Sequence, residues 1–529
     1  MNSTVILDCT LRDGGYINNW KFGYDNIKDT IDNLVSAGID MVEVGYLSSK
    51  GNFTQDESQY NSIEAIKKVL PENRGNTEMV VMINCGDYDA DMIPEKDGTS
   101  VDGIRVCFHK SQVLEAIELC RKIQSKGYAV YFQPMVALSY SDSEYLRLIG
   151  MANKFKPDGF YMVDSHGSMK KTDVARFFYL IENNLDKDIA IGFHSHNNLQ
   201  LSYSNAQYLA SLPSSHRTII DSSIMGMGRG AGNLNTELFT EYLNETEGAR
   251  YSVAPILTTI DNTISQIYLE SQWGYSLPSY LSAKYRCHQN YAKFLREKQT
   301  LTFEVMDRIF ASIDPDKRDN FDREYVETVY TAVMSDKEGQ NAKANLTELF
   351  SGRNIVIIAP GKTTAQSDEQ KKIRKIIEEN NSVVVSVNHQ PEWIDVDYIF
   401  IGNMRRYEKY SDVINSNKLI ITSNIDGDAK YTVNYEQLLN HVEGVQDNSA
   451  LMLIVLLIRS NAASVSLAGV DGYTFKERNF AYGSMETYES EEIIASRNAG
   501  LRKAISDFSA SMPIDFITKS LVGGRETDK

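Results

Sequence analysis

The stretch DIAIGFHSHNN, residues 188–198, joins a short apolar run to two histidines at its end. Side chains alternate faces along a β-strand, so residues two apart point the same way. One face of this strand would carry Ile191 and Phe193, which suit packing against helices. The other face would carry small residues and then His194 and His196. This pattern is typical of a barrel strand whose small residues point inward and whose imidazoles lie at the rim.

Similar apolar runs recur along the first 225 residues, separated by longer helical patterns. The eight strand candidates are VILDC (5–9), MVEVGY (41–46), MVVMIN (79–84), GIRVCF (103–108), YAVYFQ (128–133), GFYMVD (159–164), DIAIGFH (188–194) and TIIDSS (218–223). Strand–helix alternation predicts parallel pairing. Eight such units are the number in a (β/α)8 TIM barrel. A doubly wound open sheet is the alternative, but eight regular units favour closure.

The remainder of the chain divides into two further parts. We predict the barrel at residues 1–240, a mostly helical extension and linker at 241–345, and a smaller Rossmann-like α/β domain of unknown role at 346–529. The polar segment SDKEGQNAKAN (335–345) marks the last boundary. Strand–helix alternation then restarts at NIVIIAPG (354–361).

Composition limits the kinds of partner. The formal net charge is −17, which argues against nucleic-acid binding because that requires basic patches. Five scattered cysteines without a CxxC pair predict reduced thiols in a cytoplasmic protein. No signal-peptide pattern is visible at the N-terminus. The longest apolar run, residues 450–458, is too short to span a bilayer and predicts a buried helix.

The residues at two strand ends predict a metal site. His194 and His196 would lie at the C-terminal rim, where barrel enzymes carry their chemistry, and two imidazoles can hold one ion. Asp13 lies in CTLRDGGY (9–16), where the first strand meets its loop. One carboxylate with two imidazoles leaves positions open for substrate or water. The alternatives are a hydrogen-bonded structural histidine pair and a turn aspartate before two glycines.

Five motifs over about residues 1–300 resemble the DRE-TIM metallolyase superfamily. They are, in order, LDCTLRDGG, VEVGY, VDSHG, GFHSHNN and GMGRGAGN. The superfamily includes 4-hydroxy-2-oxovalerate aldolase, hydroxymethylglutaryl-CoA lyase, and the isopropylmalate and homocitrate synthases. The chain is most similar to the aldolase branch, because SAKYRCHQNYAKFL (282–295) resembles the helical segment after the barrel in those aldolases.

The resemblance implies a divalent metal held by Asp13, His194 and His196, with Asn233 as a further ligand. Mn²⁺ or Mg²⁺ is expected before Zn²⁺ or Co²⁺, because mixed oxygen and nitrogen ligation suits the harder ions. The metal would chelate a 2-oxo acid and act as a Lewis acid while its enolate forms.

The resemblance also implies roles for residues around the metal. Arg12 would stabilise the enolate oxygen with a fixed guanidinium. Glu43, if it faces inward, is a buried carboxylate that needs a partner. Arg12 is the candidate partner, and a rim salt bridge without a catalytic part is the alternative. In the loop GMGRGAGN (226–233), Gly228 and Gly230 would allow close approach to the substrate.

Further substrate contacts are expected from two other segments. VDSHG (163–167) corresponds to the family's DSAG, whose serine and nearby amides help to bind the substrate carboxylate. Asp164 and Ser165 are therefore candidate substrate-binding residues. Tyr291 is a further candidate, with packing between helices as the alternative.

Two departures from the family pattern concern the base. The histidine that serves as base in the well-known aldolases is Tyr16 here, and the alanine of DSAG is His166. An imidazole is better matched to neutral pH than a phenol, so we favour His166. Tyr16 and a metal-bound water are the alternatives.

The leading prediction is a metal-dependent aldolase, similar to 4-hydroxy-2-oxovalerate aldolase, that uses a pyruvate enolate and an aldehyde. We expect a homo-oligomer without a membrane span. A Claisen-type synthase or lyase using an acyl-CoA is the first alternative, and a binding scaffold with a transferase domain is the second. APGKT (359–363) lacks the full P-loop pattern, but this half faintly resembles nucleotide-sugar-binding domains, and a structural or oligomerisation role is equally open.

Overall fold

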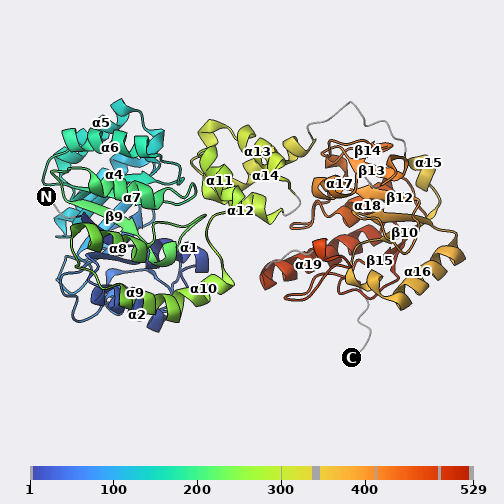
Figure 1. The fold of residues 1–529 in the computed structure, drawn as a ribbon, viewed down its shortest axis with the longest axis horizontal. Helices are drawn as coiled ribbons and strands as arrows, with labels where there is room; N and C mark the ends of the chain where they lie inside the picture. The colour runs from blue at the N-terminus through green and yellow to red at the C-terminus, as the bar shows by residue number, and fades with distance from the viewer. Residues whose placement is uncertain (1–3, 299–300, 336–345, 412–413, 486–489, 524–529) are drawn as a thin grey trace. The chain divides into compact units, whose positions relative to one another are not determined.

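The computed structural model describes residues 4–298, 301–335, 346–411, 414–485 and 490–523 and contains two compact units (Figure 1). The first unit comprises the chain up to Arg296 together with Asp314–Phe321. The second comprises Glu297–Ile313 and the chain from Asp322 onward. The helical stretch predicted at 241–345 is thus shared between the two units.

Eight parallel strands form the barrel of the first unit. They are β1 (Thr4–Asp8), β2 (Met41–Leu47), β4 (Glu78–Asn84), β5 (Gly103–Phe108), β6 (Ala129–Pro134), β7 (Gly159–Asp164), β8 (Ala190–Ser195) and β9 (Thr218–Ser222). Spatial order follows chain order, and β1 pairs with both β9 and β2, which closes the sheet. A short strand, β3 (Gln59–Tyr60), adds to the edge of β2. The predicted TIM barrel is confirmed.

Helices follow the strands around the barrel (Figure 1). They are α2 (Tyr24–Ser36), α3 (Ile63–Lys67), α4 (Val113–Ser125), α5 (Asp142–Phe155), α6 (Lys171–Asn184), α7 (Ser202–Ser211) and α8 (Thr236–Glu247). In α2, Ile27, Ile31 and Leu34 are fully buried, and this i, i+4, i+7 spacing places them on one face. Later helices of this unit are α9 (Val253–Thr259), α10 (Ser265–Glu270), α11 (Leu277–Lys284) and α12 (Gln289–Glu297), whose last residue lies in the second unit.

Strand β8 separates its two faces as the alternation predicts. Ile191 and Phe193 lie in the core between strands and helices. Ala190 belongs to the cluster inside the barrel, together with Tyr161. A Cβ on Gly192 would lie 2.3 Å from the Tyr161 ring, so only glycine leaves room for this filling tyrosine. The small inward residues of β8 therefore make space for the barrel core beneath the histidines.

The second unit is built on a seven-stranded parallel sheet. Its strands are β10 (Asn354–Ile358), β11 (Val383–Val387), β12 (Tyr398–Ile401), β13 (Leu419–Thr422), β14 (Tyr431–Val433), β15 (Ser464–Ala468) and β16 (Ile514–Phe516). The order is β14-β13-β12-β11-β10-β15-β16, so the winding direction reverses between β10 and β15. This is a doubly wound sheet, and the predicted second α/β domain is confirmed.

The helices of the second unit complete its layers. They are α13 (Phe303–Ser312), α14 (Arg323–Ser335), α15 (Thr347–Phe350), α16 (Ser367–Asn380), α17 (Met404–Tyr410), α18 (Ser449–Arg459) and α19 (Glu491–Ser509). Helix α18 contains the longest apolar run of the sequence and is buried along most of its length. Within the described ranges, no helix is both long and apolar enough to cross a bilayer.

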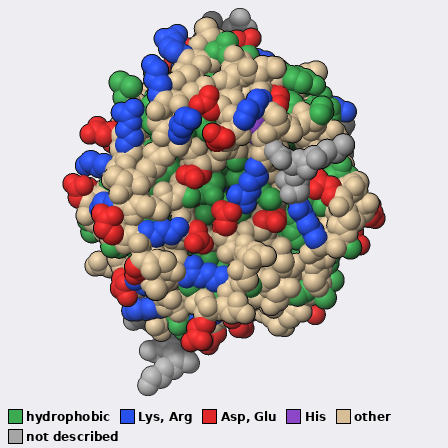
Figure 2. Space-filling view, turned by 90° about the vertical axis from the view of Figure 1, so that its left-hand side faces the viewer, with side chains coloured by type: hydrophobic (Ala, Val, Ile, Leu, Met, Phe, Trp, Pro, Cys, Tyr) green, Lys and Arg blue, Asp and Glu red, His purple; other side chains and the backbone are tan. Residues whose placement is uncertain are grey.

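Charged side chains of both signs are interspersed on the face of the molecule shown in Figure 2. The described atoms of this face form no large patch of one sign. This face therefore offers no basic stripe of the kind that nucleic-acid binding requires.

Candidate metal centre

Three side chains converge at the C-terminal rim of the barrel. Asp13 lies in a single π-helical turn, Thr10–Gly14, that follows β1. His194 is the second-last residue of β8, and His196 comes directly after the strand. One potential ligand atom from each residue lies within 4.8 Å of the other two. All three side chains are buried, with exposed fractions of 0%, 4% and 3%. This spacing and donor set fit one divalent ion.

The two imidazoles are prepared for ligation in different ways. His194 Nδ1 lies 3.0 Å from Oδ2 of Asp221, a residue of β9. A carboxylate at Nδ1 holds the proton there and leaves Nε2 for a metal. Burial lowers the pKa of His196 well below its usual range, so this ring is neutral, as a ligand must be. Asp221 was not identified from the sequence, although a carboxylate inside an apolar strand is a recognisable signal.

Asn233 completes the ring of polar atoms around Asp13. Its Nδ2 donates to Asp13 Oδ2 at 2.7 Å. Its Oδ1 is buried and has no hydrogen-bond partner among the described residues. A Cβ at Gly228 would lie 2.5 Å from Asn233 Nδ2 and 2.9 Å from Asp13 Oδ2. The glycine loop thus leaves room for Asn233, whose orphaned oxygen fits a metal ligand.

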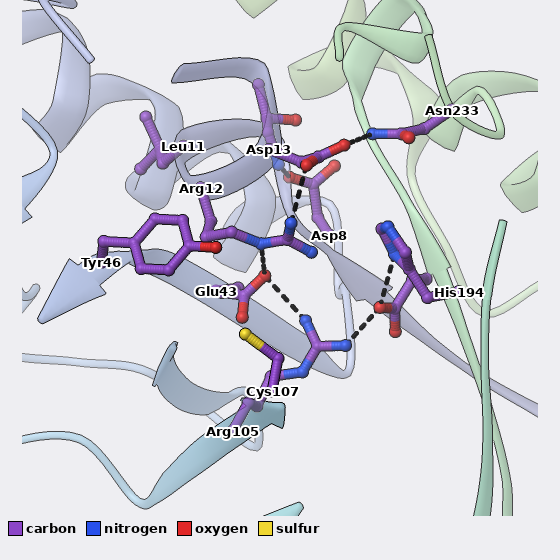
Figure 3. A network of polar contacts seen from close by, with 12 residues as sticks. Asp8, Leu11, Arg12, Asp13, Glu43, Tyr46, Arg105, Cys107, His194 and Asn233 are labelled. Atoms are coloured by element: carbon purple, nitrogen blue, oxygen red, sulfur yellow. Dashed lines mark hydrogen bonds and ion pairs between the residues drawn. The ribbon is translucent and has the colours of Figure 1, made fainter. Parts of the chain in front are cut away.

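A buried chain of alternating charges joins the two sides of the centre (Figure 3). Arg12 donates from Nη1 to Asp13 Oδ1 and from Nε to Glu43 Oε2, both at 2.7 Å. Glu43 Oε2 also pairs with Arg105 Nη1 at 2.7 Å, and Arg105 Nη2 binds Asp221. The sequence suggested the contact between Arg12 and Glu43 but no role for Arg105. A charged residue inside the apolar strand β5 could have indicated such a role. The network holds Asp13 and the Asp221 partner of His194 in one rigid frame.

The ion pairs of Arg12 leave one of its nitrogen atoms available to a substrate. Burial by itself would raise the pKa of Asp13, but the Arg12 guanidinium lowers it well below the usual range. Asp13 is therefore a carboxylate at all ordinary pH values. Arg12 Nη2 is buried and has no hydrogen-bond partner among the described residues. One donor of the guanidinium is thus free to bind a developing oxyanion.

Tyr16 lies on the short helix α1 (Gly15–Asn18) within an aromatic cluster. Its hydroxyl is 3.2 Å from that of Tyr46. The guanidinium of Arg229 lies 4.1 Å from the centroid of the Tyr16 ring. Arg229 Nε is buried and makes no hydrogen bond within the described residues. Arg229 lies in the glycine loop GMGRGAGN, but no role for it was predicted from the sequence.

His166 follows β7 and is paired with an acid from a distant segment. Its Nε2 lies 3.2 Å from Oδ1 of Asp319, which belongs to the same compact unit as the barrel. Its Nδ1 is buried and unpartnered within the described residues. Asn198 fixes this turn, because it donates to the His166 carbonyl and accepts from Ala231 N in the glycine loop. No motif marks Asp319 in the sequence.

The other residues predicted to bind the substrate make contacts within the protein. Ser165 Oγ accepts a hydrogen bond from Val136 N at 2.9 Å. The Asp164 carboxylate accepts from the backbone amides of its own turn, and burial raises its pKa to about 6. A Cβ at Gly230 would lie 2.6 Å from Asn198 Oδ1, so this glycine permits loop packing. Tyr291 packs among the helices, and its hydroxyl donates to the Lys317 carbonyl at 2.8 Å.

Comparison with known proteins matches residues 3–263 to the HMGL-like family model. The barrel is an HMGL-like domain. This match confirms the predicted relationship to the DRE-TIM metallolyases. An oxaloacetate decarboxylase from Mycobacterium tuberculosis is 26% identical over 247 residues, covering 44% of this chain and 68% of that protein. A 4-hydroxy-2-oxovalerate aldolase from Geobacillus genomosp. 3 is 25% identical over 241 residues, covering 45% and 70%.

The HMGL-like domain also has similar solved structures. The carboxyl transferase domain of Rhizobium etli pyruvate carboxylase superposes with a TM-score of 0.51 at 13% identity. The match covers 64% of this chain and 62% of that one. At this identity the likeness supports the fold alone.

Proposed function

We propose that the chain is a divalent-metal-dependent aldolase that makes or breaks a carbon–carbon bond beside a 2-oxo acid. The donor is the enolate of pyruvate and the acceptor is an aldehyde. One observation carries the proposal: Arg12 binds the metal-ligand candidate Asp13 directly and keeps one buried donor, Nη2, without a partner. A free guanidinium donor beside a metal centre suits an oxygen that gains negative charge during the reaction.

The residues divide the chemistry between them. Asp13, His194 and His196 would hold a divalent cation, which would supply Lewis acidity toward the 2-oxo acid. Arg12 donates from Nη2 to the oxygen on which the enolate charge develops. Glu43 fixes the orientation of the Arg12 guanidinium by accepting a hydrogen bond from its Nε. The buried surroundings strengthen this interaction, because few water molecules compete with it.

A base must take the hydroxyl proton during cleavage. We assign this role to His166 Nδ1, since its Nε2–H can donate to Asp319 and leave Nδ1 as the acceptor. The proton passes from the substrate hydroxyl to Nδ1, the hydroxyl oxygen forms the aldehyde carbonyl, and the bonding electrons enter the enolate. Protonation of the enolate then releases pyruvate. Tyr16 and a water molecule remain the alternative bases.

Decarboxylation of a 2-oxo acid is a second candidate function. Its support is the relative named oxaloacetate decarboxylase, and both reactions pass through an enolate. Loss of carbon dioxide requires no hydroxyl proton to be removed. A role for His166 would therefore separate aldol cleavage from decarboxylation.

The test is a comparison of substrates on the full chain, with Mn²⁺ or Mg²⁺ and after chelation. We expect metal-dependent formation of a 4-hydroxy-2-oxo acid from pyruvate and a panel of aldehydes. NMR is used to monitor this reaction. The loss of oxaloacetate is measured in parallel. Exchange of solvent protons into acetyl-CoA is compared with exchange into pyruvate. Exchange into acetyl-CoA without exchange into pyruvate would overturn the proposal in favour of an acyl-CoA reaction.

A further inference from the structure

A cavity of about 120 Å³ opens at the carboxyl edge of the second sheet. Its walls come from the loops after β10, β11 and β15, from the first turn of α18 and from α19. The winding direction of the sheet reverses between β10 and β15, so the cavity lies at the topological switch point. Open α/β sheets bind their ligands in this crevice. Polar and aromatic lining residues include Asn388, Ser449, Asp471, Tyr473, Asn479 and Phe480.

The groups that would bind a phosphate here are already engaged. In APGKT (359–363), Thr363 donates to the Asp471 carboxylate from its backbone amide at 2.8 Å and from its hydroxyl at 2.5 Å. The Lys362 ammonium pairs with Glu477 at 3.1 Å. None of the described residues lining the cavity is lysine or arginine. A carboxylate thus occupies the position that an anionic ligand would need.

The start of α18 is likewise no anion site. The side chain of Asn448 caps this helix and accepts from the backbone amides of Ala450 and Leu451. These donors of the first turn are therefore satisfied within the chain. The cavity favours a ligand without negative charge.

The remaining polar groups suit hydroxyl groups. Asp471 is buried, and its two oxygens have acceptor capacity beyond the bonds from Thr363. Asn388 Oδ1 accepts from Gly402 N, and its Nδ2 makes no hydrogen bond within the described residues. Asp471 can accept from a hydroxyl and Asn388 can donate to one. Phe480 adds an aromatic surface to the wall, and such surfaces pack against ring C–H groups.

We propose that this cavity binds the hydroxyl groups of one neutral sugar ring, with Asp471 as acceptor and Asn388 as donor. The ring is either a free sugar or the ribose of a nucleoside. The volume suits a single ring rather than a dinucleotide. The proposal concerns the second unit alone and does not depend on the reaction of the barrel.

The test is direct binding to the full chain, by ligand-observed NMR and calorimetry. The probes are D-glucose, N-acetyl-D-glucosamine, adenosine, uridine and inorganic phosphate. We expect saturable binding of at least one neutral probe and none of phosphate. Binding of a free sugar, compared with that of a nucleoside, identifies the source of the ring. Absence of binding by every neutral probe, or saturable binding of phosphate alone, would overturn the proposal.

Variants then locate the binding. Ala450→Leu places a larger side chain in the cavity from the first turn of α18 and should abolish binding. Ala463→Leu makes the same change at an exposed position that does not line the cavity and should bind like the wild type. Thermal unfolding of both variants shows whether the fold is kept.

A second variant is nearly isosteric, so it tests the cavity without filling it. Asn388→Asp keeps the acceptor for Gly402 N but removes the Nδ2 donor, and should weaken binding about tenfold. Wild-type affinity in both Ala450→Leu and Asn388→Asp would show that the neutral probe binds elsewhere.

Discussion

At the scale of single residues, Arg12 offers the sharpest test of the proposed reaction. Its Nε and Nη1 bind Glu43 and Asp13 at fixed angles, and Nη2 is left for the substrate. Lysine keeps the charge but lacks this planar fork. We expect Arg12→Lys to lower kcat by roughly two to three orders of magnitude, the scale for loss of one oxyanion donor. Steady-state kinetics with metal analysis checks this.

The matched control for that variant is Arg217→Lys. Arg217 is 41% exposed and pairs with Glu78 at 2.8 Å. The same chemical change there should leave kcat near the wild-type value. Wild-type turnover in Arg12→Lys would remove Arg12 from the mechanism.

His166 is tested by the difference between two reactions. We expect His166→Ala to slow aldol cleavage by about 10²–10⁴-fold, the range for loss of a general base, because the hydroxyl proton has no acceptor. Pyruvate proton exchange should fall less, since Arg12 still stabilises the enolate. Tyr16→Phe should have the smaller effect on cleavage. The opposite ranking of the two variants would make Tyr16 the base.

Asp8 gives a prediction about pH and stability. Burial raises its pKa from 3.8 to about 6, although Thr236 Oγ1 and Thr10 N donate to it. The folded state therefore holds this proton more tightly than the unfolded state, and the free energy of unfolding falls as pH rises from about 4 to about 6. The shift corresponds to at most about 3 kcal/mol. Asp8→Asn should remove this part of the slope in urea titrations, whereas exposed Asp29→Asn should not.

The candidate metal ligands could be predicted from the sequence, but several of the residues that hold them in place could not. Recognisable motifs place these candidates, Asp13, His194 and His196, near the ends of strands. The alternation of side chains along a strand and the parallel barrel topology then predict that they lie close together. Asp319 reaches His166 only through tertiary folding of a polar segment 153 residues away. Nothing local in that segment distinguishes it from an ordinary surface loop.

At the scale of elements, the eight strands follow from hydrophobic periodicity. The predicted first strand, residues 5–9, differs by one position from β1 (Thr4–Asp8). The π-helical turn Thr10–Gly14 was not predicted, because packing against neighbouring loops fixes its shape. Within it, a Cβ at Gly14 would lie 2.9 Å from the Met227 sulfur, so the turn and the glycine loop are in close contact. Such contacts between loops carry no periodic signal in the sequence.

The glycine loop gives a prediction at this scale. Gly228→Ala would place a methyl group 2.5 Å from Asn233 Nδ2 and 2.9 Å from Asp13 Oδ2. The loop must move, so we expect at least tenfold weaker Mn²⁺ binding by calorimetry. Gly150→Ala is the control, because a Cβ there meets nothing within 4 Å in helix α5 and should stabilise the protein by about 0.5–1 kcal/mol. Equal metal affinity in both variants would show that the loop does not shape the centre.

At the scale of the whole molecule, the two α/β parts were predictable because strand–helix alternation stops and restarts. The division of the intervening helices was not. Glu297–Ile313 belongs to the second unit, whereas Asp314–Phe321 returns to the first. Both stretches are helical or polar, and only their tertiary contacts distinguish them.

This division determines the outcome of removing the second half of the chain. A chain ending at residue 345 keeps the candidate metal ligands and Asp319, so we expect it to bind Mn²⁺ with near wild-type affinity. It also keeps α14 but lacks most of the second unit, to which α14 belongs. In the full chain, Tyr330 of α14 is buried, and its hydroxyl bonds to Asp447 at 2.7 Å and to Tyr435 at 2.9 Å. Truncation exposes this face of α14. The truncated chain should therefore bind a hydrophobic dye more strongly than the full chain does. Loss of Mn²⁺ binding in a folded truncated chain would show that the barrel requires the second unit to hold its metal.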